Sequence, residues 1–244
     1  MAVKIVTVSG KGGVGKSTVC KNLGLFFSEK QKKTLLIDCD AGLSSLDIML
    51  SCSERVNFSW ADVTDGTCNL QDAVLKINEN LFLLPSPRKP LTEEYESSVK
   101  DITTALDESF DIIIIDAPAG VGRGFRRAAM GASKALVVAT ADEVSVKGAA
   151  TVAGLLKDIG IKENRLLINR YDVKSAKKGK LLTVDEIIDK TLVQLIGIIP
   201  EDKNIMYSTV SEKKLKTKKS DSAFTRIGRR ISGENIELKI SQLK

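Results

Sequence analysis

Short apolar segments alternate with longer segments of helical periodicity along the chain. Segments that are apolar at nearly every position are typical of strands buried on both faces, as in a parallel sheet covered by helices. The alternation therefore predicts a doubly wound α/β fold, with a mostly parallel sheet and helices on both faces. The segments expected to form strands are residues 3–8, 34–38, 81–85, 111–116, 135–140, 165–169 and 195–200.

The C-terminal part of the chain shows a different pattern. Residues 212–220 are polar and predict a loop, whereas apolar side chains recur at helical spacing from 224 to 231 and predict a last helix over 220–232. Most such apolar stripes in soluble domains face a core, so we expect this helix to pack on the sheet. Residues 233–244 form a weakly amphipathic tail, which is a candidate for weak membrane contact.

Length and composition limit the possible classes of protein. The 244 residues contain no long linker or internal repeat, so we expect one domain over 1–244. The formal net charge of +6 fits an anionic partner such as a nucleotide, an acidic lipid or a nucleic acid, without choosing among them. The four cysteines are scattered and histidine is absent, which argues against a zinc site. A first strand that begins at the N-terminus, without a signal sequence or membrane span, predicts a cytoplasmic protein.

The stretch SGKGGVGKST, residues 9–18, follows the first expected strand and precedes a helical segment; we call it the P-loop. It fits the pattern G-x-x-x-x-G-K-[ST] through Gly10, Gly15, Lys16 and Ser17. In this pattern backbone N–H groups surround phosphates, the lysine reaches the β- and γ-phosphates, and the hydroxyl binds Mg²⁺. The residues expected to bind the nucleotide here are Gly10, Lys11, Gly12, Gly13, Val14, Gly15, Lys16, Ser17 and Thr18.

Acidic residues end two further expected strands. Asp38 closes one strand and Asp40 follows two residues later, so both side chains can face the same side of an extended segment. Asp116 closes another strand and is placed to hold Mg²⁺, directly or through water, while Gly120 could offer a mobile backbone N–H near the γ-phosphate. An aspartate at a strand end also commonly caps a helix or forms a turn. Because ligands bind at the carboxyl ends of parallel strands, we expect Asp40 and Asp116 to converge with the P-loop.

Lys11 has no evident role inside its own loop, because Lys16 already serves the phosphates. The stretch KGGVGKST resembles the deviant Walker A ATPases, whose pattern is K-G-G-x-G-K-[ST]. The resemblance implies that ATP is the nucleotide and that Lys11 reaches across a dimer interface to the partner's nucleotide. A positive charge supplied in this way stabilises the transferred phosphoryl group as an arginine finger does. Lys11 and Lys16 are therefore both assigned catalytic roles.

Later segments resemble the MinD type within the MinD/ParA deviant Walker A family. They are IDCDAGLSSLDIMLSCSERV, DAPAG, NRYD, GKLLTVDEII and GIIPED, and the likeness extends in order over residues 2–210. The resemblance implies that Asp40 orients or activates the attacking water and that Asp38 joins Ser17 and Asp116 in the metal and switch network. It places the adenine against Asn169, Arg170, Pro200, Glu201 and Asp202.

This resemblance implies a slow ATP hydrolase that is used as a dimerisation switch. The ATP-bound homodimer would regulate division-site placement at the inner face of the plasma membrane, with division-inhibitor and activator proteins as partners. The family's partner-binding helix often carries several charges after the sequence EVS. In this chain residues 143–150 read EVSVKGAA, with Lys147 followed by small neutral residues, so the partner-binding surface departs from the family pattern.

Two other classes of function compete with this interpretation. A ParA-like ATPase that positions DNA or another cargo would use the basic charge and the lysines of KKLKTKK, residues 213–219, although a solvated loop explains these lysines equally well. An ATP-dependent carrier of metal clusters would need paired cysteines at a dimer seam, and Cys39 and Cys52 give that reading little support. We expect DNA to be a less favoured partner than an anionic membrane.

Overall fold

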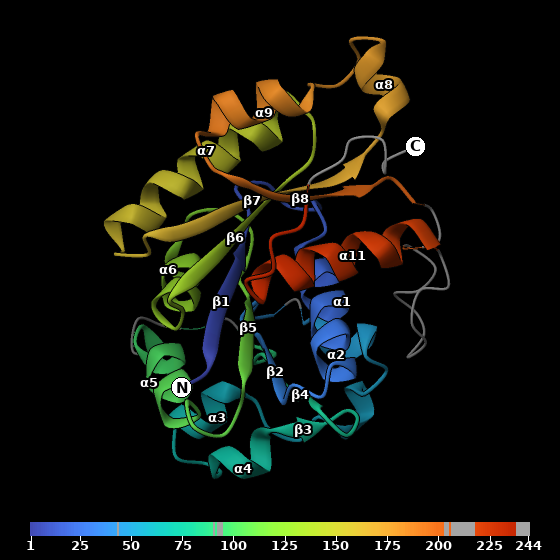
Figure 1. Ribbon diagram of the computed structural model, residues 1–244. Coiled ribbons are helices and arrows are strands. Elements are labelled where there is room, and N and C mark those ends of the chain that lie inside the picture. Colours follow the sequence, from blue (N-terminus) through green and yellow to red (C-terminus); the bar gives the residue numbers. More distant parts are fainter. Residues whose placement is uncertain (43, 90, 92–94, 203–204, 206–217, 238–244) are drawn as a thin grey trace.

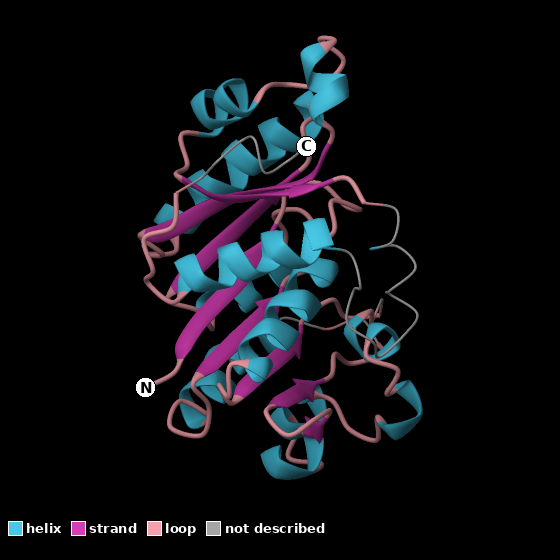
Figure 2. Ribbon diagram, turned by 45° about the vertical axis from the view of Figure 1, so that its right-hand side comes forward, coloured by secondary structure: helices cyan, strands magenta, loops and turns pink. Residues whose placement is uncertain are grey.

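An eight-stranded sheet runs through the centre of the molecule and carries helices on both faces (Figure 1, Figure 2). The computed structural model describes residues 1–42, 44–89, 91, 95–202, 205 and 218–237, and the following statements concern these residues. The strands are β1 (Val3–Val8), β2 (Thr34–Asp38), β3 (Leu75–Lys76), β4 (Leu81–Leu84), β5 (Ile112–Asp116), β6 (Lys134–Ala139), β7 (Glu163–Tyr171) and β8 (Leu195–Pro200).

The strand order is β3-β4-β2-β5-β1-β6-β7-β8, and neighbouring strands are parallel except for β3 against β4. This confirms the predicted doubly wound, mostly parallel α/β fold. The sequence pattern missed β3, because two residues are too short to show alternation. The predicted strand 165–169 is also shorter than β7, because the residues at the ends of β7 are polar but still pair with β6 and β8.

Two layers of helices cover the sheet (Figure 1). One apolar cluster joins the sheet to α1, α2 and α11, and the other joins it to α3, α5, α6, α7 and α9. The helices are α1 (Lys16–Glu29), α2 (Leu46–Met49), α3 (Trp60–Thr64), α4 (Leu70–Ala73), α5 (Ser98–Ala105), α6 (Arg123–Met130), α7 (Glu143–Asp158), α8 (Val173–Lys177), α9 (Val184–Thr191) and α11 (Lys218–Ile231), and a 3₁₀ turn spans Ser53–Arg55.

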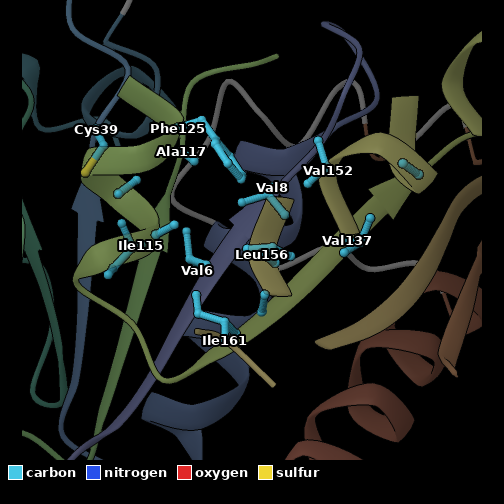
Figure 3. Close-up of a cluster of buried hydrophobic side chains, with 14 of the residues drawn as sticks. Val6, Val8, Cys39, Ile115, Ala117, Phe125, Val137, Val152, Leu156 and Ile161 are labelled. Carbon is cyan, nitrogen blue, oxygen red and sulfur yellow. The ribbon is translucent and has the colours of Figure 1, made fainter. Parts of the chain in front are cut away.

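The central strand β1 shows how the sequence divides the core between these layers. Val6 and Val8 point to the face covered by α6 and α7, where Phe125 and Val152 pack against them (Figure 3). Ile5, on the opposite side of the strand, belongs to the cluster that packs on α1. Full burial of a side chain of this size stabilises a fold by about 1.5–3 kcal/mol, so both layers are firmly attached to the strand that leads into the P-loop.

The last helix packs on the sheet, as the apolar stripe predicted. Phe224 and Ile227 of α11 are 3% and 1% exposed and lie against α1 and β8. The polar segment 212–220 is predicted as a loop, and its residues 212–217 lie outside the described part of the chain. Helix α11 begins at Lys218, so the loop prediction is wrong for the last three residues of the segment. Lysine and serine are tolerated in helices, and nothing in these residues interrupts the turn that leads into Phe224.

The first part of the tail folds back onto the domain. The guanidinium of Arg230 donates to the carbonyl oxygens of Ile196, Ile236 and Glu237 at 2.8, 3.0 and 2.9 Å. Arg229 adds an ion pair to Glu234 at 2.6 Å. The beginning of the predicted tail is therefore attached to the amino end of β8, whereas residues 238–244 lie outside the described part of the chain.

Candidate functional site

The residues expected to bind nucleotide gather at the carboxyl edge of the sheet, on both sides of β1. The P-loop follows β1 directly, and Asp38 and Asp116 lie opposite each other at the ends of the paired strands β2 and β5. The strand order places β5 and β6 on opposite sides of β1, which is the type of topological switch point where α/β sheets bind ligands. The fold thus brings together residues from distant parts of the sequence.

The P-loop has the backbone geometry of an anion site. Gly13 and Gly15 adopt positive φ angles of 76° and 94°, which side chains rarely tolerate. Gly15 precedes α1 without a side-chain cap, and the first turn of the helix holds no acidic residue. The N–H groups at the start of α1 are therefore left for a ligand, and the helix dipole favours a negative one. Lys16 is the first residue of this helix and is 8% exposed.

Helix α7 packs directly on the P-loop. A Cβ atom at Gly10 would overlap the backbone of Gly148, so the two glycines allow the loop and the helix to touch. Lys11 lies at the same junction, and its Nζ is 3.0 Å from Oδ1 of Asp142. Asp142 also caps α7, because its side chain accepts a hydrogen bond from the backbone N–H of Ser145.

The sequence analysis did not find Asp142. Burial alone would raise the pKa of this carboxyl, but hydrogen bonds from Thr140 and Lys11 bring it below its usual value. The carboxylate is therefore ionised at neutral pH and holds Lys11 within its own subunit. The only signal in the sequence was an aspartate just before a helical segment, which by itself indicates an N-cap.

Asp116 is the most unusual carboxylate at this edge. It is 1% exposed, and within the described part of the chain neither of its oxygens has a hydrogen-bond partner of regular geometry. Burial, and then the nearby charge of Asp38, raise its pKa to about 7, although Ser17 and Lys16 act in the opposite direction. A buried carboxylate without partners beside a P-loop hydroxyl suits a hard cation such as Mg²⁺, which takes oxygen ligands.

Asp38 organises the segment that leads into α2. Its carboxylate accepts hydrogen bonds from the backbone N–H groups of Asp40, Ser45 and Leu46, at 3.0, 3.0 and 3.1 Å. The Ser45 hydroxyl then donates to the Ser17 hydroxyl at 3.0 Å. Asp38 thus connects this segment to the P-loop, which favours a switch role over direct metal ligation.

Asp40 is half-buried at the same edge. Burial raises the pKa of this carboxyl, and the charge of Lys16 partly lowers it. Gly120, after β5, has a φ of 88°, and its backbone N–H donates to the carbonyl of Ser9 at 3.0 Å. That N–H would have to leave Ser9 before it could serve a phosphate, so its predicted role requires a local movement.

A cavity of about 400 Å³ opens beside the P-loop, lined by Gly12, Gly13, Arg170 and Glu201 among others. Arg170 and Glu201 form an ion pair at 3.1 Å across it. The residues predicted from the resemblance to hold adenine, 169–170 and 200–202, therefore lie near one another at the ends of β7 and β8. A cavity of about 510 Å³ at the start of β1 is larger but contains no P-loop residue.

The cysteines are placed unfavourably for a metal cluster at a subunit seam. Cys39 and Cys52 are 1% and 2% exposed, and Cys39 packs in the core on the α6 side of the sheet (Figure 3). Burial raises the pKa of the Cys39 thiol, so that the thiolate needed as a metal ligand is disfavoured. These positions give no support to the cluster-carrier interpretation.

Comparisons with known proteins identify the family of the chain. The AAA domain family matches residues 2–169. The septum site-determining protein MinD of Thermotoga maritima is 36% identical over 96% of this chain and 89% of its own length, and that of Bacillus subtilis is 32% identical over 98% and 92%. Among solved structures, the MinC:MinD cell division protein complex of Aquifex aeolicus matches with a TM-score of 0.88 and 33% identity over 98% of both chains.

MinD of Pyrococcus horikoshii complexed with Mg-ADP also matches, with a TM-score of 0.83 and 27% identity over 95% of this chain and 96% of that one. The relatives are matched over nearly their whole lengths, so the likeness is not restricted to the P-loop. The chain belongs to the MinD family of septum-site-determining ATPases.

Proposed function

We propose that the chain is a Mg²⁺-dependent ATPase that works as a nucleotide-switched dimer. The observation that carries the proposal is the buried, unpartnered carboxylate of Asp116 beside an uncapped P-loop helix. Ser17 and Asp116 hold Mg²⁺, and Lys16 binds the β- and γ-phosphates. When bound, Mg²⁺ neutralises charge on these phosphates. A relative from Pyrococcus horikoshii is described with Mg-ADP, which supports the binding of Mg²⁺ together with an adenine nucleotide here.

Hydrolysis is assigned to the segment between β2 and α2. Asp40 lies half-buried near Lys16, where it orients the attacking water toward the γ-phosphate. Asp38 holds that segment by three backbone hydrogen bonds and links it through Ser45 to Ser17. The Gly120 N–H leaves the Ser9 carbonyl and donates to the γ-phosphate. The segment and the P-loop thus respond together to the presence of the γ-phosphate.

Dimerisation is assigned to Lys11. In the single subunit Lys11 pairs with Asp142, at the exposed junction of the P-loop and α7. In the ATP-bound dimer Lys11 leaves this carboxylate and reaches the partner's nucleotide. The negative charges of the phosphates attract it more strongly there than the single carboxylate of Asp142 does. Exposed apolar side chains at the same edge, Val121 and Val144, are 45% and 66% exposed and are available for subunit contact.

Two lysine variants test the proposal. Lys16→Ala should weaken ATP binding itself, because it removes charge at the phosphates of the same subunit. Lys11→Ala should retain ATP binding by the monomer but abolish ATP-dependent dimerisation and turnover. Size-exclusion chromatography with a slowly hydrolysed ATP analogue, together with phosphate release, separates the two effects. A Lys11→Ala protein that dimerises and hydrolyses ATP normally would contradict the assignment to Lys11.

The cellular role that follows is regulation of division-site placement. A relative in Aquifex aeolicus is described in a MinC:MinD complex, which supports a division-inhibitor partner for this chain. Between Val144 and Thr151 of α7 the exposed side chains are Val144, Lys147 and Thr151, so a partner that binds this stretch meets a single charge, whereas the ends of the helix expose Glu143, Lys157 and Asp158. A partner that binds the stretch from Val144 to Thr151 should therefore rely mainly on apolar and backbone contacts there.

The proposed location is the inner face of the plasma membrane, with weak and salt-sensitive binding. Within the described residues, no helix combines the length and the apolar character needed to cross a bilayer. Because α11 packs on the domain, the anchor is left to the tail and to the lysines of 213–219. These lysines, which lie largely outside the described residues, contribute about 1 kcal/mol each near an acidic surface.

Co-sedimentation with anionic liposomes and with duplex DNA, at matched salt and with ADP or ATP, tests this location. Preference for DNA would favour the ParA-like alternative.

A further inference from the structure

Trp60, the only tryptophan of the chain, lies at the start of α3 and is completely buried. Its indole Nε1 donates a hydrogen bond to the backbone carbonyl oxygen of Asp38 at 2.9 Å. The next backbone group, the N–H of Cys39, donates to the carbonyl oxygen of Asp116 at 2.9 Å. The peptide bond between Asp38 and Cys39 is therefore held from two sides, by α3 through its oxygen and by β5 through its N–H.

This peptide bond controls the position of Asp40. Asp40 follows Cys39 directly, and its backbone N–H donates to the Asp38 carboxylate at 3.0 Å. The Cys39 side chain is 1% exposed and belongs to the apolar cluster that contains Ala117 and Phe125 (Figure 3). A peptide unit is planar and moves as a rigid body. A rotation of the unit before Cys39 would therefore displace the Asp40 carboxylate relative to the P-loop.

A buried arginine from α6 lies over the Trp60 ring. The Cζ atom of Arg127 is 5.5 Å from the centre of this ring, and the residue is 5% exposed. A guanidinium is attracted to the face of an indole, most strongly where water is excluded. Arg127 also donates from Nε to the backbone carbonyl oxygen of Tyr95 at 2.8 Å, which holds the guanidinium in place. The Trp60 ring is therefore attached to α6 as well as to α3.

Helix α6 is attached in turn to the loop after β5. It begins at Arg123, just after Gly120, whose N–H is assigned to the γ-phosphate in the proposed function. A Cβ atom at Gly124 would overlap the ring of Pro118, so the first turn of α6 packs closely on this loop. Release of the Gly120 N–H toward a phosphate should therefore displace α6, and with it Arg127.

We propose that Trp60 is a positioning residue for ATP hydrolysis, which holds the peptide bond before Cys39 so that Asp40 faces the attacking water. This rests on the proposed function, in which Asp40 orients that water. Arg127, over the Trp60 ring, makes the arrangement depend on the position of the Gly120 loop. Trp60 belongs to the apolar cluster on the face of the sheet opposite α1, so it acts on hydrolysis and not on binding of the phosphates.

The proposal predicts a loss of turnover without a loss of ATP affinity. Trp60→Phe keeps a large buried ring but lacks the N–H that reaches Asp38. Loss of one hydrogen bond typically changes an equilibrium constant by about 2- to 12-fold. The fraction of molecules with Asp40 correctly placed, and kcat with it, should fall by this factor. The fall should be smaller than in Asp40→Ala, because the carboxylate itself is still present.

Phosphate release at saturating ATP, at a protein concentration where each variant is dimeric, measures kcat. Calorimetric titration with a slowly hydrolysed ATP analogue measures the affinity, which should equal that of the parent, and the fraction of protein that binds. Tyr95→Phe is the matched control, because it keeps the ring that packs edge-on against Trp60 and loses a hydroxyl that donates to Asp65. Its kcat should equal that of the parent.

A double variant tests the role of Arg127. Arg127→Met removes the cation over the Trp60 ring but keeps an apolar side chain of similar length, and it should also lower kcat at unchanged analogue affinity. The double variant of Trp60→Phe and Arg127→Met should be no slower than the slower single variant, because both changes act through the same hydrogen bond. Independent effects would multiply instead, and would overturn the link to the Gly120 loop.

The remaining outcomes separate the inference from the function on which it rests. A parental kcat in Trp60→Phe, while Asp40→Ala is slow, would overturn the inference. A fall in analogue affinity that matches the fall in kcat would overturn it too, because Trp60 would then support the site as a whole. Thermal melting shows whether Trp60→Phe folds, and if it does not, Arg127→Met is judged by the same two measurements. Normal hydrolysis by Asp40→Ala would instead contradict the proposed function.

Discussion

Replacement of Asp142 by asparagine should make the ATP-bound dimer form more readily. Lys11 is held by the Asp142 carboxylate in the single subunit and must leave it to reach a partner's nucleotide. Asparagine keeps a side-chain oxygen for the Ser145 N–H and is as good an N-cap as aspartate, so the start of α7 should be preserved. The substitution therefore removes mainly the attraction between Lys11 and its own subunit.

The structure limits the size of this effect. The Lys11 and Asp142 side chains are 43% and 35% exposed, so their ion pair is screened by solvent. Exposed pairs of this type contribute about 0.2–1 kcal/mol each. Two such pairs break when a dimer forms, so the dissociation constant of the dimer should fall by about 2- to 30-fold.

Sedimentation velocity over a range of protein concentrations, with a slowly hydrolysed ATP analogue, measures this constant. The matched control is Asp158→Asn, which makes the same change of charge at the exposed end of α7. The advantage of Asp142→Asn should shrink at high salt, because salt weakens the ion pair that it removes. An Asp142→Asn protein that dimerises less readily than the parent would refute the reasoning, since Asp142 would then stabilise the dimer itself.

Two further variants probe the carboxylates of the site. Asp40→Ala should bind ATP, accumulate as a dimer and release phosphate more slowly by about 10²- to 10⁴-fold, whereas turnover within a few-fold of the parent would exclude Asp40 as the group that orients water. Asp116→Asn should make the metal-free protein more stable than the parent at alkaline pH. The pKa of Asp116 is about 7 in the folded protein but about 3.8 in the unfolded chain, so at alkaline pH the folded parent must keep a buried charge that asparagine lacks. The stability of the parent should therefore fall as pH rises through this window, by at most about 4 kcal/mol, and thermal melting in a chelator at about pH 5 and pH 8 should show no such fall for Asp116→Asn.

The features that could be predicted from the sequence depend on local chemistry. The strands around β1 are apolar at nearly every position, so burial on both faces could be inferred before any pairing was known. The P-loop could be predicted because its glycines, lysines and hydroxyl lie within ten consecutive residues and need only a strand before them and a helix after them. The apolar stripe of α11 likewise indicated a buried face, which Phe224 and Ile227 confirm.

The features that could not be predicted depend on contacts between distant residues. Asp142 is 131 positions from Lys11, and the sequence around it indicated only a helix cap. Asn169 is 155 positions from Val14, and its hydrogen bond follows from a register shift between β7 and β8 that no local pattern reveals. The short strand β3 owes its conformation to pairing with β4 rather than to its own two residues.

The central claim, that Lys11 completes the active site of the other subunit, is tested most directly by mixing two inactive variants. Lys11→Ala lacks the lysine but keeps Asp40, and Asp40→Ala lacks the aspartate but keeps Lys11. In the mixed dimer, one site has its own Asp40 and receives Lys11 from the partner. If Lys11 acts across the interface, phosphate release in an equal mixture should rise well above that of either variant alone, because each mixed dimer holds one complete site. If size-exclusion chromatography shows mixed dimers but the mixture stays as inactive as its components, Lys11 acts within its own subunit and the account is contradicted.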